Sequence, residues 1–330
     1  MSTLEKDIRL KNVPLKKFQD SSYLLFKYGV VVAFVILIIL ATILYPGFLR
    51  TDNLLNMFSQ LSIIGIMSIG MTFVMITGGL DMSIGGIYAA SAVIVASLAD
   101  GTPLVIAFGI TLIIGFAAGL INGLLVTKLR VPPFVATLGT GSIFTGIALV
   151  YSNAQPFFVQ KQSFQWLGSG YLIGNIPVSV VLLFAAYIIT GIILAYTTYG
   201  KSLYSIGGNF EASRLSGLRV NWLIISAYGL CGLCASVSGL IIASRLGQGQ
   251  ANIGDLIVLD VIAAVVIGGT SLSGGQGAIW RTVIGGSILI ILSNVFDSLS
   301  LSPYWQSIFK GAIIIGAVMF DFYARSKINK

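Results

Sequence analysis

Apolar and polar positions alternate along this chain in long blocks. Stretches of about 20 mostly apolar residues, the length that crosses a bilayer core, are separated by short segments rich in Gly, Pro and charged residues. Ten such stretches are read as membrane-spanning helices: 28–46, 56–77, 83–99, 104–126, 133–151, 178–197, 222–244, 257–271, 279–296 and 305–322. The pattern predicts an all-α polytopic membrane protein of about ten helices, some of them broken. The weakest span is 257–271, which is short and contains Asp260.

Basic residues gather on one side of this predicted topology. If the N-terminus is cytoplasmic, the far side carries three basic residues and Lys310 falls inside the last span. The other 15 lie on the cytoplasmic side: Lys6, Arg9, Lys11, Lys16, Lys17, Lys27, Lys128, Arg130, Lys201, Arg214, Arg219, Arg281, Arg325, Lys327 and Lys330. An excess of Lys and Arg marks the cytoplasmic face, so both termini are expected there.

The predicted organisation follows from these spans. A cytoplasmic N-terminal segment, 1–27, precedes an apolar run too long for a signal-peptide core, so the first span is expected to remain as an anchor. The transmembrane domain covers 28–322 and includes a cytoplasmic loop at 198–221. A cytoplasmic tail occupies 323–330.

Composition supports lipid as the solvent. Hydrophobic residues make up 56% of the 330-residue chain and charged residues 9%, whereas about 25% is usual in soluble proteins. The net charge of +8 is explained by the topology, and no nucleic-acid partner is expected. The chain has no histidine, which excludes His-based catalysis and His-ligated zinc. Cys231 and Cys234 share a helix face and are read as small packing residues, as are Gly115, Gly119 and Gly123.

A polar string interrupts the apolar spans at 77–86. Thr77, Gly78 and Gly79 are followed by Asp81 and Ser83, a composition that suits a broken helix lining a protein-enclosed path. Asp81 is read either as a cap of the next helix or as a group of the solute path or gate, because intramembrane acids are costly and often functional.

A similar string recurs at 268–275. Gly78, Gly79, Ser83 and Gly85 align with residues 268, 269, 273 and 275, which indicates either an internal duplication or a chance match of glycine-rich turns. The string at 272–276 reads LSGGQ, a signature of ABC ATPase domains. No phosphate-binding GxxxxGK[ST] loop exists in the chain, so these residues are interpreted as a turn between two spans.

The loop at 198–221 is the most informative polar segment. Gly208 or Asn209 can begin a short helix over 210–216, and Gly217 can end it. The alternatives are an ordinary solvated loop and a docking helix for a cytoplasmic partner. The candidate docking residues are Gly208, Asn209, Glu211, Ala212, Arg214, Ser216 and Gly217.

Further polar and aromatic residues inside or beside the spans are candidates for a path suited to a sugar. With the residues of the 77–86 string they comprise Asn122, Thr137, Thr140, Asp260, Thr270, Ser271, Asn294, Tyr304, Trp305 and Gln306. Tyr304 and Trp305 also fit an interfacial aromatic belt. The scarcity of buried charges argues against an ion-coupled secondary carrier, although Asp81 and Asp260 remain.

Five strings in order carry a family resemblance. They are GMTFV at 70–74 leading into GGLDMSIG at 78–85, VPPFVATLGT at 131–140, IGGNFEASRLSG at 206–217, AAVVIGGTSLSGG at 263–275 and SPYWQ at 302–306. Over about 47–321 the chain resembles the permease subunit of bacterial ABC sugar importers of the ribose/xylose/galactoside type. One departure is Val258, where that family commonly has Glu before the kept Asp260.

The resemblance implies a non-enzymatic transport subunit of the bacterial inner membrane that moves a monosaccharide, with a ribose-like pentose favoured. The implied partners are a cytoplasmic ABC ATPase that binds ATP and Mg, a periplasmic or lipid-anchored sugar-binding protein, and a second permease subunit, favoured as a homodimer. The chain itself is expected to bind no cofactor or metal. The alternatives are a hexose, inositol or furanosyl signalling-molecule permease of the same family, or a stand-alone secondary carrier. The sequence does not identify the sugar.

Overall fold

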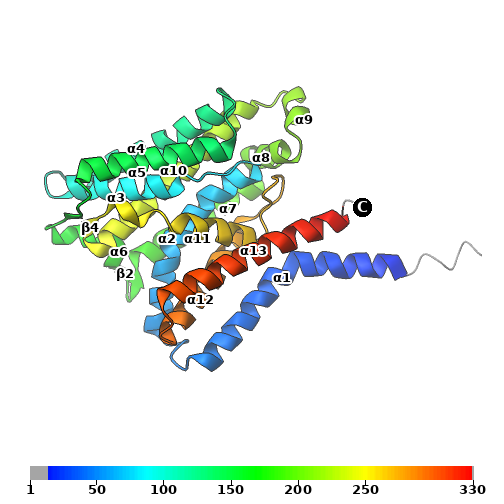
Figure 1. The fold of residues 1–330 in the computed structure, drawn as a ribbon, viewed down its shortest axis with the longest axis horizontal. Coiled ribbons are helices and arrows are strands. Elements are labelled where there is room, and N and C mark those ends of the chain that lie inside the picture. The colour runs from blue at the N-terminus through cyan, green and yellow to red at the C-terminus, as the bar shows by residue number, and fades with distance from the viewer. Residues whose placement is uncertain (1–13, 329–330) are drawn as a thin grey trace, which may run out of the picture.

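The computed structural model describes residues 14–328, almost all of them in helices (Figure 1). Two helices, α1 (Pro14–Leu44) and α2 (Thr51–Ile76), open the chain. The others are α3 (Ile84–Ala99), α4 (Leu104–Thr127), α5 (Pro133–Ser152), α6 (Trp166–Ser169), α7 (Val178–Tyr196), α8 (Thr198–Gly208), α9 (Phe210–Leu215), α10 (Val220–Leu246), α11 (Ile257–Ile267), α12 (Ile279–Ser298) and α13 (Pro303–Ile328). Each of the ten predicted ranges contains a helix.

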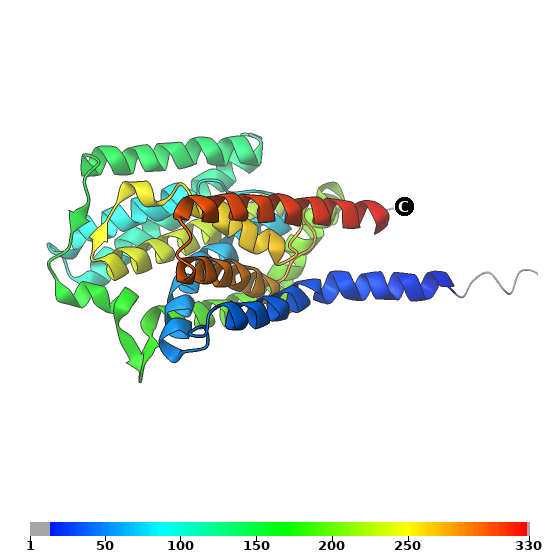
Figure 2. The ribbon, with the colours of Figure 1, turned by 60° about the horizontal axis from the view of Figure 1, so that its bottom comes forward.

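Six of the described helices are long and apolar enough to cross a membrane, namely α2, α4, α5, α7, α10 and α12. The apolar part of α1 (Gly29–Leu44) and α3 are shorter apolar helices. The start of α1 and the end of α13 lie at the same end of the molecule as α8 and α9, whereas α6 and the short strands lie at the opposite end (Figures 1 and 2).

Some boundaries differ from the prediction. Helix α11 ends at Ile267, because Gly269 adopts a left-handed backbone that stops the helix. Residues 198–208 form helix α8 instead of a loop. The polar segment 152–177 holds a two-stranded hairpin of β2 (Tyr171–Ile173) and β3 (Ile176–Pro177), and β1 (Phe157–Phe158) pairs with β4 (Gln248–Gly249).

Terminal boundaries differ too. Helices α1 and α13 extend into the predicted terminal segments. The first 13 residues of the N-terminal segment, and 329–330 of the tail, lie outside the described residues.

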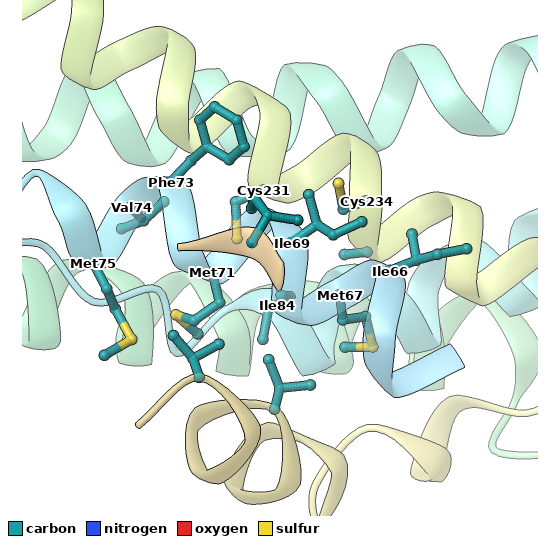
Figure 3. Packing of buried hydrophobic residues seen from close by; sticks show 14 of the residues in the cluster. Ile66, Met67, Ile69, Met71, Phe73, Val74, Met75, Ile84, Cys231 and Cys234 are labelled. Atoms are coloured by element: carbon teal, nitrogen blue, oxygen red, sulfur yellow. The ribbon is translucent and has the colours of Figure 1, made fainter. Parts of the chain in front are cut away.

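Helices α2 and α10 form the centre of the fold. Nearly the whole second half of α2, including Met67, Ile69, Met71 and Phe73, is shielded from solvent, and Figure 3 shows these side chains packed beside the cysteines of α10. Both cysteines are buried free thiols. They pack as the sequence predicted, since the backbone of Cys231 approaches Gly70 closely.

Glycine sets the distance between α4 and α10. A Cβ at Gly123 would lie 2.6 Å from the Cα of Ile225, and one at Gly115 would lie 2.6 Å from the hydroxyl of Ser236. At Gly119 the added atom would collide with the carbonyl of Tyr228. The antiparallel helices therefore touch backbone to backbone, as small residues permit in membrane helices.

We expect Gly119→Ala to destabilise the protein, because overpacking a filled contact costs about 1–3 kcal/mol. The midpoint of thermal unfolding in detergent measures the effect. The matched control on the same helix is Gly109→Ala, where a Cβ meets nothing within 4 Å and the midpoint should stay unchanged. Equal midpoints for both variants would contradict the proposed backbone contact.

Candidate functional site

Four predicted path residues form one series of hydrogen bonds: Thr140 of α5, Asn122 of α4, and Ser83 and Asp81 of the segment that precedes α3. The hydroxyl of Thr140 donates to Asn122 Oδ1 at 2.6 Å, and Asn122 Nδ2 donates to Ser83 Oγ at 2.6 Å. Ser83 then donates to Asp81 Oδ1 twice, from its hydroxyl at 2.6 Å and from its backbone N–H at 3.0 Å. All four side chains are buried, and the bonds run in one direction toward the carboxylate, an arrangement that strengthens each bond.

A second set of hydrogen bonds fixes the backbone on either side of Asp81, at Leu80 and Met82. The hydroxyl of Thr137 lies 2.8 Å from the carbonyl of Pro133 and 3.2 Å from that of Leu80. It also accepts from the backbone N–H of Met82 at 2.9 Å. The hydroxyl of Tyr228 donates to the Leu80 carbonyl at 3.4 Å. The non-helical backbone between α2 and α3 is therefore satisfied by side chains, as burial requires.

Asp81 fixes the turn that precedes α3. Ser83 is the N-cap residue of α3 and its side chain makes no capping bond. Asp81 accepts the N–H two residues ahead, the pattern of an Asx turn, so it orders the approach to the helix and is not the N-cap itself. Its second oxygen, Oδ2, is buried and has no hydrogen bond within the described structure.

Three glycine segments meet beside this break. Gly274 and Gly275 have left-handed backbones, and a Cβ at Gly274 would lie 2.8 Å from the backbone nitrogen of Gly78. Gly275 donates its N–H to the carbonyl of Ile76 at 2.9 Å. A Cβ at Gly207, near the end of α8, would collide with that same carbonyl. We call this contact of 76–79, 207–208 and 274–275 the glycine junction.

The two similar strings share one way of ending a helix, with an offset of one residue from the alignment made on the sequence. The first residue after the C-cap has a left-handed backbone in both, Gly78 after α2 and Gly269 after α11. In each the next residue donates its N–H five residues back, to Val74 or to Val265, which is a Schellman cap. The LSGGQ residues thus form a turn between α11 and α12, as interpreted from the sequence. The buried hydroxyl of Thr270 has no partner within the described structure.

Helix α9 is a short exposed helix supported by α8. Asn209 begins it and accepts the N–H of Ala212 at 2.9 Å. Gly217 follows with a left-handed backbone. Arg214 pairs with Glu211 at 2.9 Å, and both side chains are more than 60% exposed. The predicted helix over 210–216 is therefore present, with the predicted residues at its ends.

Tyrosine side chains tie α8 to the rest of the fold. The hydroxyl of Tyr204 donates to the carbonyl of Gly277 at 2.7 Å, and that of Tyr199 lies 2.9 Å from Ser226 Oγ. Burial raises the pKa of Tyr204, and nearby Arg281 opposes the shift. The phenol stays protonated and keeps its bond to the loop that follows the glycine junction.

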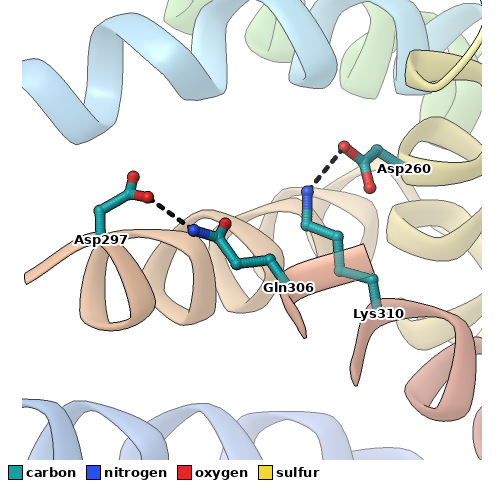
Figure 4. Close-up of polar contacts among 4 residues, drawn as sticks. All are labelled: Asp260, Asp297, Gln306 and Lys310. Atoms are coloured by element: carbon teal, nitrogen blue, oxygen red, sulfur yellow. Dashed lines mark hydrogen bonds and ion pairs between the residues drawn. The ribbon is translucent and has the colours of Figure 1, made fainter. Parts of the chain in front are cut away.

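The remaining predicted path residues lie apart from the Asp81 network. Asp260 of α11 pairs with Lys310 of α13 at 3.0 Å, and both side chains are partly exposed (Figure 4). Near the start of α13, Gln306 donates to Asp297 at 2.7 Å. Sequence reasoning missed the role of Lys310, although a lone lysine inside a predicted span signals a nearby partner.

Three other predicted residues take different positions. Asn294 exchanges side-chain hydrogen bonds with Asn53 of α2, at 2.7 and 3.2 Å. Tyr304 and Trp305 are exposed at the start of α13. The sequence offered no signal for the amide pair, whose two members are separated by 241 positions.

A cavity of about 220 Å³ lies at the end of the molecule opposite α9. It is lined by Leu149, Ala154, Gln155, Pro156, Gln250, Ala251 and Asn252. Its amide side chains can donate and accept hydrogen bonds, which suits contact with a polyhydroxylated solute.

Comparison with known proteins gives the family. The profile described as "Branched-chain amino acid transport system / permease component" matches residues 53–318. The ribose import permease protein RbsC of Bacillus subtilis (strain 168) is 42% identical over 298 residues, covering 89% of this chain and 92% of that protein. No solved structure matches the chain.

Two relatives from Escherichia coli (strain K12) are similar over most of their length. The probable ABC transporter permease protein YphD is 34% identical over 322 residues, covering 97% of this chain and 96% of that protein. The galactose/methyl galactoside import permease protein MglC is 34% identical over 316 residues, covering 89% and 94%.

The resemblance to ABC importer permeases is therefore confirmed, as is the expectation of a non-enzymatic, multi-pass membrane subunit. The chain belongs to the family of branched-chain amino acid transport system permease components.

Proposed function

We propose that this chain carries a ribose-like pentose across the bacterial inner membrane as one subunit of an ATP-driven importer. The observation that carries the proposal is the exposed helix α9, connected through α8 to the break between α2 and α3. The ribose import permeases of several bacteria, at 37–42% identity, support the choice of sugar. ATP and Mg bind to a separate ATPase.

In the proposed topology ten helices span the membrane and both termini are cytoplasmic. Helices at all ten predicted ranges support it, and the start of α1 and the end of α13 lie at the same end as α8 and α9 (Figure 1). That end also carries most of the basic residues, including Lys128, Lys201 and Arg281, consistent with a cytoplasmic face.

Helix α9 docks into the ATPase and transmits the motion of the ATPase to the membrane-spanning helices. A push on α9 reaches α8, whose Gly207 touches the end of α2 without an intervening side chain. The same contact reaches the α11–α12 turn through Gly275 and Tyr204. Closure of the ATPase thereby moves both breaks together, which is the rigid-body behaviour expected of alternating access.

The polar residues divide into a structural set and a path set. The Asp81 network is wholly buried and self-satisfied apart from one oxygen, so it holds the break in shape. Asp260, Tyr304, Trp305, Gln306 and Lys310 lie on α11 and α13, where they are partly or largely exposed.

The faces of α11 and α13 also support a second permease subunit. An ion pair at membrane depth must face protein or a water-filled path because lipid solvates it poorly. A second copy of the chain, forming a homodimer, provides that enclosure and places the path between the two copies. A sugar-binding protein delivers solute at the end opposite α9, beside the cavity around Gln155 and Gln250.

Uptake assays test the function directly. Cells that express the chain with its own ATPase and binding protein should accumulate labelled ribose, and unlabelled ribose should compete better than galactose or inositol. Glu211→Ala should abolish uptake while ATP hydrolysis continues. The lost pair with Arg214 is an exposed one worth only about 0–1 kcal/mol, so the permease should stay folded.

The control for this variant is Ser202→Ala on the adjoining helix, where an exposed hydroxyl bonds only its own helix and uptake should persist. Normal ribose uptake in Glu211→Ala would remove the coupling role of α9. Preference for another sugar would remove the ribose assignment.

Substitutions at Asp81 test whether this residue stabilises the fold or acts on the solute. Asp81→Asn keeps the acceptor for both bonds from Ser83, so transport and thermal stability should remain near normal. Asp81→Leu leaves those donors unpaired and should cost about 1–3 kcal/mol, measured as a lower unfolding midpoint. A complete transport defect in well-expressed Asp81→Asn would show that the charge itself acts in transport.

The Asp260–Lys310 pair permits a two-step test. Lys310→Met leaves a carboxylate unpaired at membrane depth, so the yield of folded protein should fall steeply. The double variant Asp260→Asn/Lys310→Met should recover folding and lose uptake, because the path has lost its charged groups. Normal uptake by the double variant would place the pair outside the path, and normal yield of Lys310→Met would refute its structural importance.

A further inference from the structure

A cavity of about 390 Å³ opens at the end of the molecule that carries α9. It lies where the end of α4, the segment after α9 and the start of α10 meet. Its lining is Lys128, Arg214, Leu218, Arg219, Val220, Asn221 and Trp222. The Asp81 network and the Asp260–Lys310 pair contribute none of these residues, and we call this hollow the basic cavity.

The basic cavity carries an uncompensated positive charge. The side chains of Lys128 and Arg219 are exposed and make no hydrogen bond or ion pair with the described part of the chain. Arg214 is partly neutralised by Glu211 at 2.9 Å. The sequence contains no other acidic residue between Asp100 and Asp255. The cavity therefore attracts an anion that the chain itself does not supply.

The backbone adds to this attraction. Helix α10, of 27 residues, starts at Val220, and its N-cap residue Arg219 makes no side-chain capping bond. The N–H of Val220 donates to the carbonyl of Leu218 at 2.8 Å, so the N–H groups of Asn221 and Trp222 remain to carry the partial positive charge of the first turn, which binds phosphate well. The two basic side chains and this helix start thus point to an anionic group of phosphate type.

An apolar strip runs from the cavity along α4. Ile110, Ile114, Ile121 and Leu124 are all exposed, and their spacing places them on one helix face together with Lys128. Trp222 is 62% exposed at the mouth of the cavity, and tryptophan side chains prefer the level of lipid headgroups. A ligand that fits both features has an anionic head and long apolar tails.

We propose that the basic cavity binds an anionic phospholipid of the cytoplasmic leaflet. Its phosphate contacts Lys128 and Arg219, the indole of Trp222 lies beside the glycerol region, and the acyl chains follow the exposed face of α4. The proposal rests on the membrane orientation proposed above. An acidic protein segment would match the charge but leaves the α4 strip and Trp222 unexplained.

A lipid bound in the basic cavity would lie close enough to α9 to influence transport. The cavity wall includes Arg214 of α9, whose neighbour Glu211 is the proposed ATPase contact. A bound headgroup competes with Glu211 for Arg214 and adds negative charge beneath α9. Anionic lipid therefore adjusts the position of the docking helix in addition to solvating α4.

Native mass spectrometry of the purified, delipidated chain tests the site with phosphatidylglycerol and phosphatidylcholine of identical acyl chains. Phosphatidylglycerol should bind more tightly. Lys128→Gln/Arg219→Gln should weaken that binding about 30-fold, since each basic residue near an anionic headgroup is worth about 1 kcal/mol and 1.4 kcal/mol is tenfold. Affinity for phosphatidylcholine should not change.

Two controls show whether binding depends on positive charge and on the position of that charge. Lys128→Arg/Arg219→Lys should retain phosphatidylglycerol binding, and Lys201→Gln, an exposed basic residue of α8, should change it less than twofold. Equal loss in Lys201→Gln, or no loss in the double glutamine variant, overturns the proposal. Competition by inorganic phosphate at the lipid's own affinity would identify a free-anion site instead.

A protein occupant gives a different outcome. If the double glutamine variant kept its lipid affinity but bound the ATPase more weakly, the cavity would be a docking site for an acidic protein segment. Because lipid binding is measured on the permease alone, its failure leaves the sugar-uptake results intact. Conversely, if cells with the unmodified protein took up no ribose, the transport proposal would be refuted, and the lipid-binding result would still stand.

Discussion

Close approach of backbones at glycine is the constraint on which the rest of the structure depends. At the α4–α10 contact and at the glycine junction, added Cβ atoms would meet main-chain atoms that cannot move aside. Without a water-driven hydrophobic effect between helices in lipid, tight van der Waals contact is a principal source of association. At the glycine junction this close approach also fixes where α8 touches the end of α2.

Polar groups in this fold serve two different purposes. The series of hydrogen bonds from Thr140 to Asp81 stabilises the non-helical backbone between α2 and α3, and all of its side chains are buried. Asp260 and Lys310 form an ion pair between α11 and α13, and their side chains remain partly exposed. The first group therefore stabilises the break between two helices, whereas the second joins α11 to α13 near the surface.

Sequence patterns predicted the helices and the ends of α9 because both follow local rules. Apolar length marks a span, and Asn209 and Gly217 have side-chain and backbone properties that suit a helix start and stop. The patterns also named Asn122, Thr137 and Thr140 without relating them to Asp81, since that relation depends on how α3, α4 and α5 pack. The partners of Asn294 and Asp260 were missed for the same reason. Helix α8 was read as a loop because its three glycines and several polar residues, taken from the sequence alone, are typical of a segment that interrupts a helix.

The glycine junction also restricts how the protein can change during evolution. A substitution that enlarges Gly207 or Gly274 disturbs three segments at once, so a single replacement elsewhere cannot compensate for it. Larger side chains are accommodated more readily on the open faces of α5, α11 and α13, where exposed residues such as Val135, Leu259 and Phe309 can change without moving a neighbouring backbone. Engineered substitutions meet the same limits: the glycine junction tolerates no added side chain, whereas the open helix faces do.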